Sequence, residues 1–212
     1  MRFILCLSLF LSLMSNTLAG ESAYTYTKSN NIYYYSKTNN HTLQLTNSGI
    51  NSDSALSPNG RWVAFIKKSD YILQSDCLYF LSRGSHGDEI WIYDLKKMQQ
   101  RLLVANHFSC NEMSQVILDP SHLTFSPDSK TLYFATSAWV TSGAIHAVNV
   151  DGKNLRFVTN GNEYRIIMHG HYKGDLIINQ HRYYDPPGNG SYDWDWLFSP
   201  NGKQIKLYQK ID

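Results

Sequence analysis

A short turn motif, Ser-Pro-Asn or Ser-Pro-Asp followed by Gly or Ser, occurs three times in the sequence. The three copies begin at Ser57, Ser126 and Ser199. Proline presets the backbone angle φ at the second position of a tight turn, and the Asx-Gly or Asx-Ser pair tolerates the sharp exit from it. Apolar or aromatic residues flank each copy, so each copy predicts a β-hairpin.

A second pattern of apolar and aromatic segments alternates with the first. These segments begin at residues 32, 90, 145 and 194, and each leads through a turn into another apolar segment. In the last repeat, residues 172–175 are the expected inner turn, and the Ser199 turn closes an outer hairpin instead. No helical periodicity extends over ten or more residues. The pattern predicts an all-β array of about four four-stranded antiparallel blades, a small or incomplete propeller. The expected blades are 23–49 (partial), 54–105, 122–161 and 163–210.

The composition agrees with strands and excludes two classes of protein. The 15 Tyr, 9 Phe and 5 Trp suit the pleated surface of a sheet. A formal net charge of +2 excludes a nucleic-acid binder that relies on bulk positive charge. No stretch reaches the roughly 20 apolar residues of a transmembrane helix, so no transmembrane segment is expected.

The N-terminus has the pattern of a secretory signal peptide. Arg2 provides a positive charge, residues 3–14 are mostly apolar, and Thr17 and Ala19 are small residues at the positions a signal peptidase reads. We expect cleavage after Ala19, which leaves residues 20–212 as a single domain. The protein is therefore expected to be periplasmic or secreted.

Two cysteines, Cys77 and Cys110, remain after the predicted cleavage. In an oxidising compartment an even pair favours a disulfide bond. The two residues lie in the stretches 67–86 and 106–121, which are longer than typical connections between strands. We expect these stretches to be insertions that the bond joins to each other.

The repeats resemble those of TolB-like propellers, also called WD40-like or PD40 repeats. The resemblance rests on the Ser-Pro turns, on Ile-Trp-Ile-Tyr-Asp-Leu at 90–95 and on Val-Asn-Val-Asp-Gly-Lys-Asn-Leu at 148–155. It implies a bacterial periplasmic platform that binds proteins. TolB-like propellers usually have about six blades, whereas this chain has room for about four. It would form either a small closed ring or an open arc that a second copy completes as a homodimer.

An aromatic segment near the C-terminus is a candidate ligand site. On a strand, Tyr192, Trp194 and Trp196 would share one face, and Asp193 and Asp195 the other. Such a row could bind a sugar or a peptide at the mouth of a propeller. The alternative is that the large rings pack between blades.

Three histidines are the candidate metal ligands. His169 and His171 would face the same side of a strand, and His181 follows about one strand later. Neutral imidazoles bind zinc or manganese, and the related oligogalacturonate lyases use a histidine site on a propeller. Gly170 favours the alternative of a bulge or turn, in which the histidines are exposed or hydrogen-bonded.

Two functional hypotheses follow. The Gly-x-Ser-x-Gly pattern of hydrolase nucleophiles does not occur in the sequence, which favours a binding or scaffold module for a protein, peptide or envelope component without a cofactor. The alternative is a small metal-dependent glycan lyase or hydrolase that uses the three histidines.

Overall fold

A computed structural model describes residues 22–71, 86–139, 142–186 and 188–210 of the 212-residue chain. The predicted signal peptide lies outside the described residues. Cys77 does too, so its pairing with Cys110 stays a prediction. No helix in the described ranges is long and apolar enough to cross a membrane.

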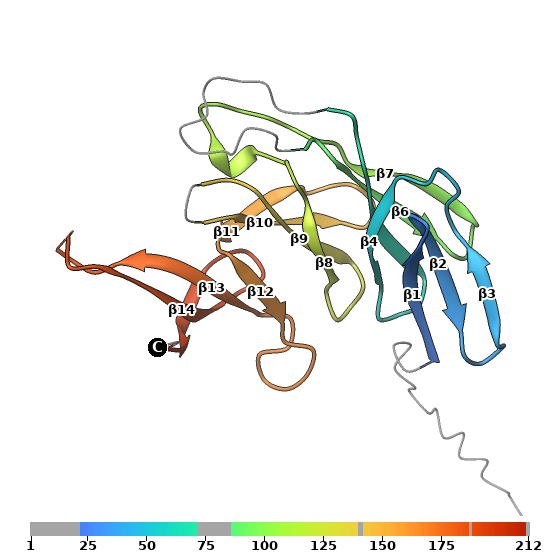
Figure 1. The fold of residues 1–212 in the computed structure, drawn as a ribbon. Coiled ribbons are helices and arrows are strands. Elements are labelled where there is room, and N and C mark those ends of the chain that lie inside the picture. Colours follow the sequence, from blue (N-terminus) through green and yellow to red (C-terminus); the bar gives the residue numbers. More distant parts are fainter. Residues whose placement is uncertain (1–21, 72–85, 140–141, 187, 211–212) are drawn as a thin grey trace, which may run out of the picture.

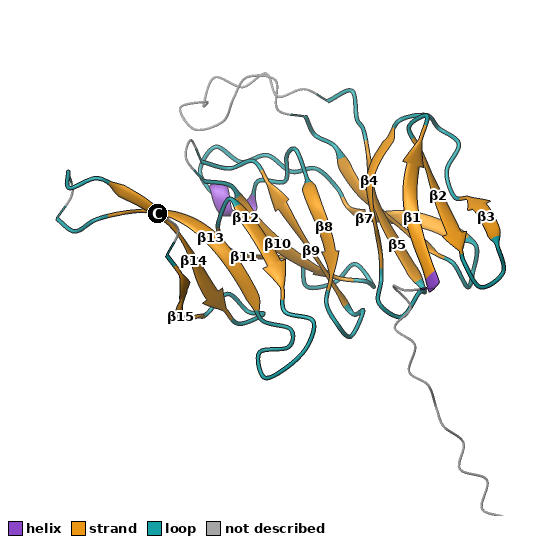
Figure 2. Ribbon diagram, turned by 60° about the horizontal axis from the view of Figure 1, so that its bottom comes forward, coloured by secondary structure: helices purple, strands orange, loops and turns teal. Residues whose placement is uncertain are grey.

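The described residues form four antiparallel sheets, in each of which strands that follow one another in the chain are paired (Figures 1 and 2). Blade 1 contains β1 (Ala23–Lys28), β2 (Asn31–Ser36) and β3 (His41–Gln44). Blade 2 contains β4 (Asn51–Leu56), β5 (Trp62–Lys67), β6 (Glu89–Asp94) and β7 (Gln99–Val104). Blade 3 contains β8 (Ser121–Phe125), β9 (Thr131–Thr136), β10 (Ala144–Asn149) and β11 (Arg156–Asn160). Blade 4 contains β12 (Glu163–Ile166), β13 (Leu176–Tyr183), β14 (Ser191–Phe198) and β15 (Gln204–Gln209).

The blades follow one another in an arc from β1–β3 to β12–β15, and the arc does not close into a ring (Figure 2). This arrangement confirms the predicted all-β, incomplete propeller. The partial first blade has three strands within the described residues, against four in each of the others. The hairpins also match the repeat pattern, because the first two Ser-Pro turns join inner strands and the third joins the outer strands β14 and β15.

The three Ser-Pro turns have the same hydrogen bonds. In each copy the serine carbonyl accepts a hydrogen bond from the N–H three residues later, at 2.8–2.9 Å. The serine hydroxyl bonds the Asx side chain two residues on, as Ser57 does with Asn59 and Ser126 with Asp128. The residue after Asx has a positive φ, 68° at Gly60 and 62° at Ser129. The motif thus encodes one turn geometry at three places.

Apolar side chains fill the space between successive blades. One cluster lies between each pair, and together these clusters form the core. Fully buried examples are Ile32 and Phe65 between blades 1 and 2, Ile92 and Phe134 between blades 2 and 3, and Ile145 and Ile178 between blades 3 and 4. Each such side chain contributes about 1.5–3 kcal/mol by its removal from water. The blades are therefore held together face to face by these clusters.

The connection between β7 and β8 packs a small core of its own. It contains the short 3₁₀ helix η1 (Met113–Gln115), and an isolated bridge joins His107 to Ile117. Val116 and Leu118 are fully buried there, against Phe108 and Met113. This stretch is part of the predicted insertion 106–121, and η1 lies against β11 of blade 3.

Candidate functional site

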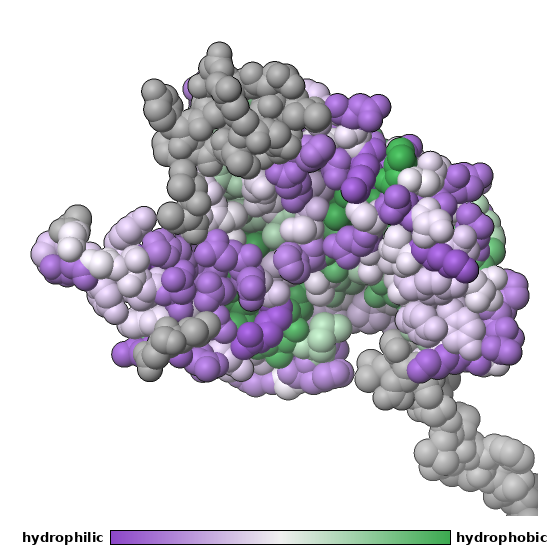
Figure 3. Space-filling view, viewed as in Figure 1, coloured by the Kyte–Doolittle hydropathy of each residue, from purple (hydrophilic) through white to green (hydrophobic). Residues whose placement is uncertain are grey.

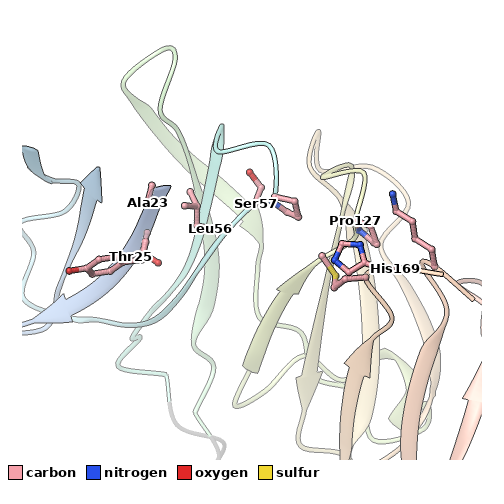
Figure 4. A pocket seen from close by; sticks show the side chains of 10 residues that line it. Ala23, Thr25, Leu56, Ser57, Pro127 and His169 are labelled. Atoms are coloured by element: carbon pink, nitrogen blue, oxygen red, sulfur yellow. The ribbon is translucent and has the colours of Figure 1, made fainter. Parts of the chain in front are cut away.

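The concave side of the arc contains a pocket with a volume of about 510 Å³. β1 and the first strands of blades 2 and 3 lie side by side here, since β1 contacts β4 and β4 contacts β8. The pocket lies between the start of β1 and the turns that follow β4, β8 and β12 (Figure 4). Its lining residues are Ala23, Tyr24, Thr25, Leu56, Ser57, Pro58, Pro127, Met168, His169 and Lys173.

Two of the Ser-Pro turns are joined directly, which fixes one wall of the pocket. The backbone N–H of Asn59 donates a hydrogen bond of 3.0 Å to the hydroxyl of Ser129, 70 residues away in the sequence. This bond connects the β4–β5 turn of blade 2 with the β8–β9 turn of blade 3. Pro58 and Pro127, one from each turn, both face the pocket. The repeated motif thus supplies equivalent residues to one binding surface.

Bulges in the inner strands also repeat. Asp53 in β4 and His122 in β8 each lie at a shift in strand register and have a positive φ, 41° and 54° respectively. Each lies five residues before the proline of the turn that follows its strand. The hydroxyl of Tyr164 in β12 donates to the carbonyl of His122. Burial raises the pKa of this hydroxyl, so it stays a donor at physiological pH. The bond ties the inner strand of blade 4 to that of blade 3.

The pocket combines apolar walls with positive charge at one side. Ala23 and Leu56 face Pro127 and His169 across the opening (Figure 4). Hydrophobic residues also surface in the middle of the arc in the space-filling view (Figure 3). The ten lining residues include the amine of Lys173 and an imidazole but no carboxylate. The arrangement suits a ligand with an apolar part and an anionic or hydrogen-bond-accepting group.

The predicted aromatic row lies on β14, with its rings on one face as expected. The ring centroids of Tyr192 and Trp194 are 4.1 Å apart, and those of Trp194 and Trp196 are 6.3 Å apart. The protein's own cations occupy ring faces: the Arg182 guanidinium carbon lies 3.9 Å from the Trp196 centroid and the Lys210 amine 4.9 Å from that of Trp194. Trp196 also packs against the core between blades 3 and 4. Ligand binding by this row stays a prediction.

The two predicted aspartates lie on the opposite face of β14, each beside a partner. An oxygen of the Asp193 carboxylate lies 3.0 Å from Nδ1 of the His181 ring. Asp195 is buried and lies 3.4 Å from the Arg165 guanidinium and 3.2 Å from the Asn179 amide. These carboxylates do not share a surface with the aromatic rings.

The three predicted metal ligands lie in two different places. His169 and His171 are in the connection between β12 and β13, not on a strand, because Gly170 between them adopts a left-handed turn with φ of 82°. His181 is on β13, next to Asp193. Within the described part of the chain, no group of three or more His, Cys, Asp or Glu side chains could hold a metal ion. The geometry thus gives the metal hypothesis no support.

Most of the pocket residues were not candidates from the sequence. Of the ten lining residues, the sequence indicates only His169 as a site residue, and it does so as a metal ligand. The Ser-Pro motif predicted turns, but a turn motif says nothing about which ends of the blades meet. The available signal was its repetition: equivalent turns in stacked blades come to the same end of the array.

Comparison with known proteins supports the fold and leaves the family open. No protein-family model and no curated protein matches the chain. Among solved structures, the β-propeller domain of the trilobed protease from Pyrococcus furiosus matches with a TM-score of 0.54 and 14% identity, over 89% of this chain and 54% of that one. Porphyromonas gingivalis dipeptidyl peptidase 4 matches with a TM-score of 0.61 and 10% identity, over 90% and 31%. Acylaminoacyl peptidase from Pyrococcus horikoshii matches with a TM-score of 0.56 and 13% identity, over 89% and 30%.

This chain thus spans about half or less of the length of these solved structures. At these identities the likeness concerns the fold alone. The chain has a propeller-like fold similar to the propeller parts of peptidases.

Proposed function

We propose that this protein is an exported, TolB-like binding module of the bacterial periplasm that binds a protein or peptide of the cell envelope in the pocket on its concave side. The pocket is the observation that carries the proposal. Its volume of about 510 Å³ is within the range of sites for small ligands and short peptide segments. Four different blades contribute to it, so an intact arc is needed to form it.

The chemistry of the pocket supports a peptide as ligand. Apolar side chains such as Leu56 and Met168 can surround an apolar side chain of the partner, and Lys173 can bind a carboxylate or a carbonyl oxygen. The likeness to propeller domains of peptidases, which are parts of longer chains, supports a binding or scaffold role for this fold. The metal-dependent lyase alternative has no comparable observation behind it.

Selection from a phage-displayed library of random peptides, each about twelve residues long, tests the proposal. The selected peptides are synthesised, and their dissociation constants are measured by fluorescence anisotropy. We expect Lys173→Glu to weaken binding at least about tenfold, because it replaces the cation of the pocket by an anion.

Lys203→Glu is the matched control, since it makes the same charge change in the exposed β14–β15 turn, outside the pocket. We expect it to alter binding less than about twofold. Peptides that bind both variants equally well, or a library that yields no binder, would contradict the proposed site.

A further inference from the structure

Blade 1 has an open position next to β1. In blades 2, 3 and 4, four strands pair in order, and the sheet of blade 1 has three within the described residues. The sequence repeat aligns β2 with β6, β10 and β14, the third strands of their blades. β1 then corresponds to a second strand, and the missing strand is the innermost one. Within the described residues, the empty position is therefore at the edge of β1 that faces away from β2.

The register of the β1–β2 pair shows which backbone groups face that position. Lys37 N–H donates to the Ser22 carbonyl at 2.7 Å, so Ser22 and Lys37 are a hydrogen-bonded pair. Hydrogen-bonded pairs alternate along an antiparallel ladder. The pairs at Tyr24 and Tyr26 are therefore bonded to β2. The N–H and C=O groups of Ala23 and Thr25 point the other way, toward the open position.

These groups lack a backbone partner among the described residues, although their surroundings are partly dry. Ala23 is 6% exposed. β4 approaches β1, and the Ser54 hydroxyl donates a hydrogen bond of 3.1 Å to the Thr25 hydroxyl, but among the described strands β4 pairs with β5 alone. An unpaired backbone group away from water is unfavourable until it finds a hydrogen-bonding partner.

The unpaired edge borders the pocket. Ala23 and Thr25 line it on one side, and His169 lies across from them (Figure 4). Tyr24, Met168 and Lys173 are also lining residues. An extended peptide placed against Ala23 and Thr25 would therefore have its side chains beside the apolar residues of the pocket (Figure 4). The Lys173 amine, which also lines the pocket, could bind a carbonyl oxygen or an acidic side chain of this peptide.

We propose that the ligand is an extended segment of a partner polypeptide that adds to β1 as a fourth strand and completes blade 1. The inference rests on the proposed function and names the form of its ligand. Strand addition gives affinity through main-chain hydrogen bonds and specificity through pockets for alternate side chains. The N–H and C=O groups of Ala23 and Thr25 would form the main-chain hydrogen bonds. The pocket can receive the alternate side chains, and the Lys173 amine, with no carboxylate among the ten lining residues, favours a segment with an acidic side chain.

Backbone N-methylation of a selected peptide tests the pairing. Two versions are made, one methylated at the odd residues and one at the even residues, so that the side chains stay unchanged. Only one set of N–H groups faces β1 in a strand. We expect one version to lose affinity at least about tenfold and the other to change less than about threefold.

A proline scan of β1 gives the reciprocal measurement. Ala23→Pro removes an N–H that faces the pocket without removing a bond to β2, and we expect it to weaken the peptide at least about tenfold. Thr27→Pro is the control, because Thr27 also faces away from β2 but lies outside the pocket. Circular dichroism verifies that both variants are folded.

Three outcomes would overturn the strand addition. If both methylated peptides bind like the parent while Lys173→Glu still abolishes binding, the pocket binds peptides without pairing, and the proposed function survives alone. If both lose affinity equally, the peptide is not a strand at a single edge. If the free protein is a dimer that Ala23→Pro converts to monomers, the occupant of the edge is a second copy of this chain.

Discussion

Blade 3 and blade 1 are built from the same repeat but are covered differently. Five of the six residues of β9 are buried, because its side chains enter the cluster with blade 2 on one face and the cluster with blade 4 on the other. In β2 of blade 1 only Ile32 is buried. Tyr24, Tyr26 and Tyr33 lie on the face of blade 1 that points away from blade 2, and their rings contact one another.

The sequences of the two blades reflect this difference. β9 reads Thr-Leu-Tyr-Phe-Ala-Thr, with a continuous apolar centre, whereas β1 alternates as Ala-Tyr-Thr-Tyr-Thr-Lys. A strand covered on both faces needs apolar residues at successive positions, and a strand covered on one face needs them at alternate positions. Tyrosine suits the half-covered face, since its ring packs and its hydroxyl remains in water. Position in the array, more than the repeat, therefore sets the burial of each blade.

Phe134→Ala is expected to have the largest effect on stability. Phe134 in β9 is fully buried between blades 2 and 3 and stacks on the His146 ring with centroids 5.4 Å apart. Its truncation leaves a cavity and should lower the free energy of unfolding by about 3–5 kcal/mol. Urea denaturation measures this change. A loss below about 1 kcal/mol would mean that blade 3 is not the tightly packed centre of the arc.

Gly202→Ala comes next and should be compared with Gly49→Ala. Both glycines have positive φ, 84° and 71°. A Cβ at Gly202 would lie 2.1 Å from the Val158 carbonyl oxygen in β11 of blade 3, whereas a Cβ at Gly49, after blade 1, would meet no atom of the described residues within 4 Å. We expect a loss of about 2–4 kcal/mol at Gly202 and about 1–2 kcal/mol at Gly49. Equal losses of stability in thermal or urea unfolding would show that the close approach of Gly202 to the Val158 carbonyl adds no cost.

His146 makes the stability of blade 3 depend on pH. Burial lowers the pKa of this imidazole from 6.5 to about 4, and its Nε2 is buried with no hydrogen-bond partner in the described part of the chain. Between pH 6.5 and 4 the unfolded chain gains a proton that the folded chain does not. Stability should therefore be complete above pH 6.5 and fall by up to about 3 kcal/mol toward pH 4. Urea unfolding of wild type and His146→Leu over this range isolates the effect; parallel curves would refute it.

Tyr26→Ala on the uncovered face of blade 1 should have the smallest effect. Its ring stacks on that of Tyr33, the residue directly opposite on β2, with centroids 5.3 Å apart. Loss of this cross-strand pair should cost about 0.5–1.5 kcal/mol in urea unfolding. A loss as large as that of Phe134→Ala would show that another surface covers blade 1 in solution.

The sequence was sufficient for features that depend on neighbouring residues. The Ser-Pro turns and the 172–175 turn were predictable because each is set by a few consecutive residues. The alternation of Tyr192 and Asp193 followed from the period of a strand. The strand assumption was wrong for His169 and His171, because the turn at Gly170 interrupts it.

Features that depend on distant residues could not be predicted in this way. The bond between Asn59 and Ser129 joins two blades, and the pocket beside it exists only once the blades are stacked. The cations over the aromatic row come from β13 and from Lys210 after β15. Their placement depends on strand pairing and on the path of the C-terminal residues. The spacing of the aromatic residues predicts neither.

Amide hydrogen exchange at Ala23 and Thr25 tests the account most directly. In the free protein these two amides point away from β2 and should exchange faster than those of Tyr24 and Tyr26, which are bonded to β2. A selected peptide should slow exchange at Ala23 and Thr25 and leave the alternate positions nearly unchanged. Two results would contradict the open strand position next to β1. One is exchange rates that do not alternate along β1 in the free protein, and the other is peptide binding that leaves both amides unprotected.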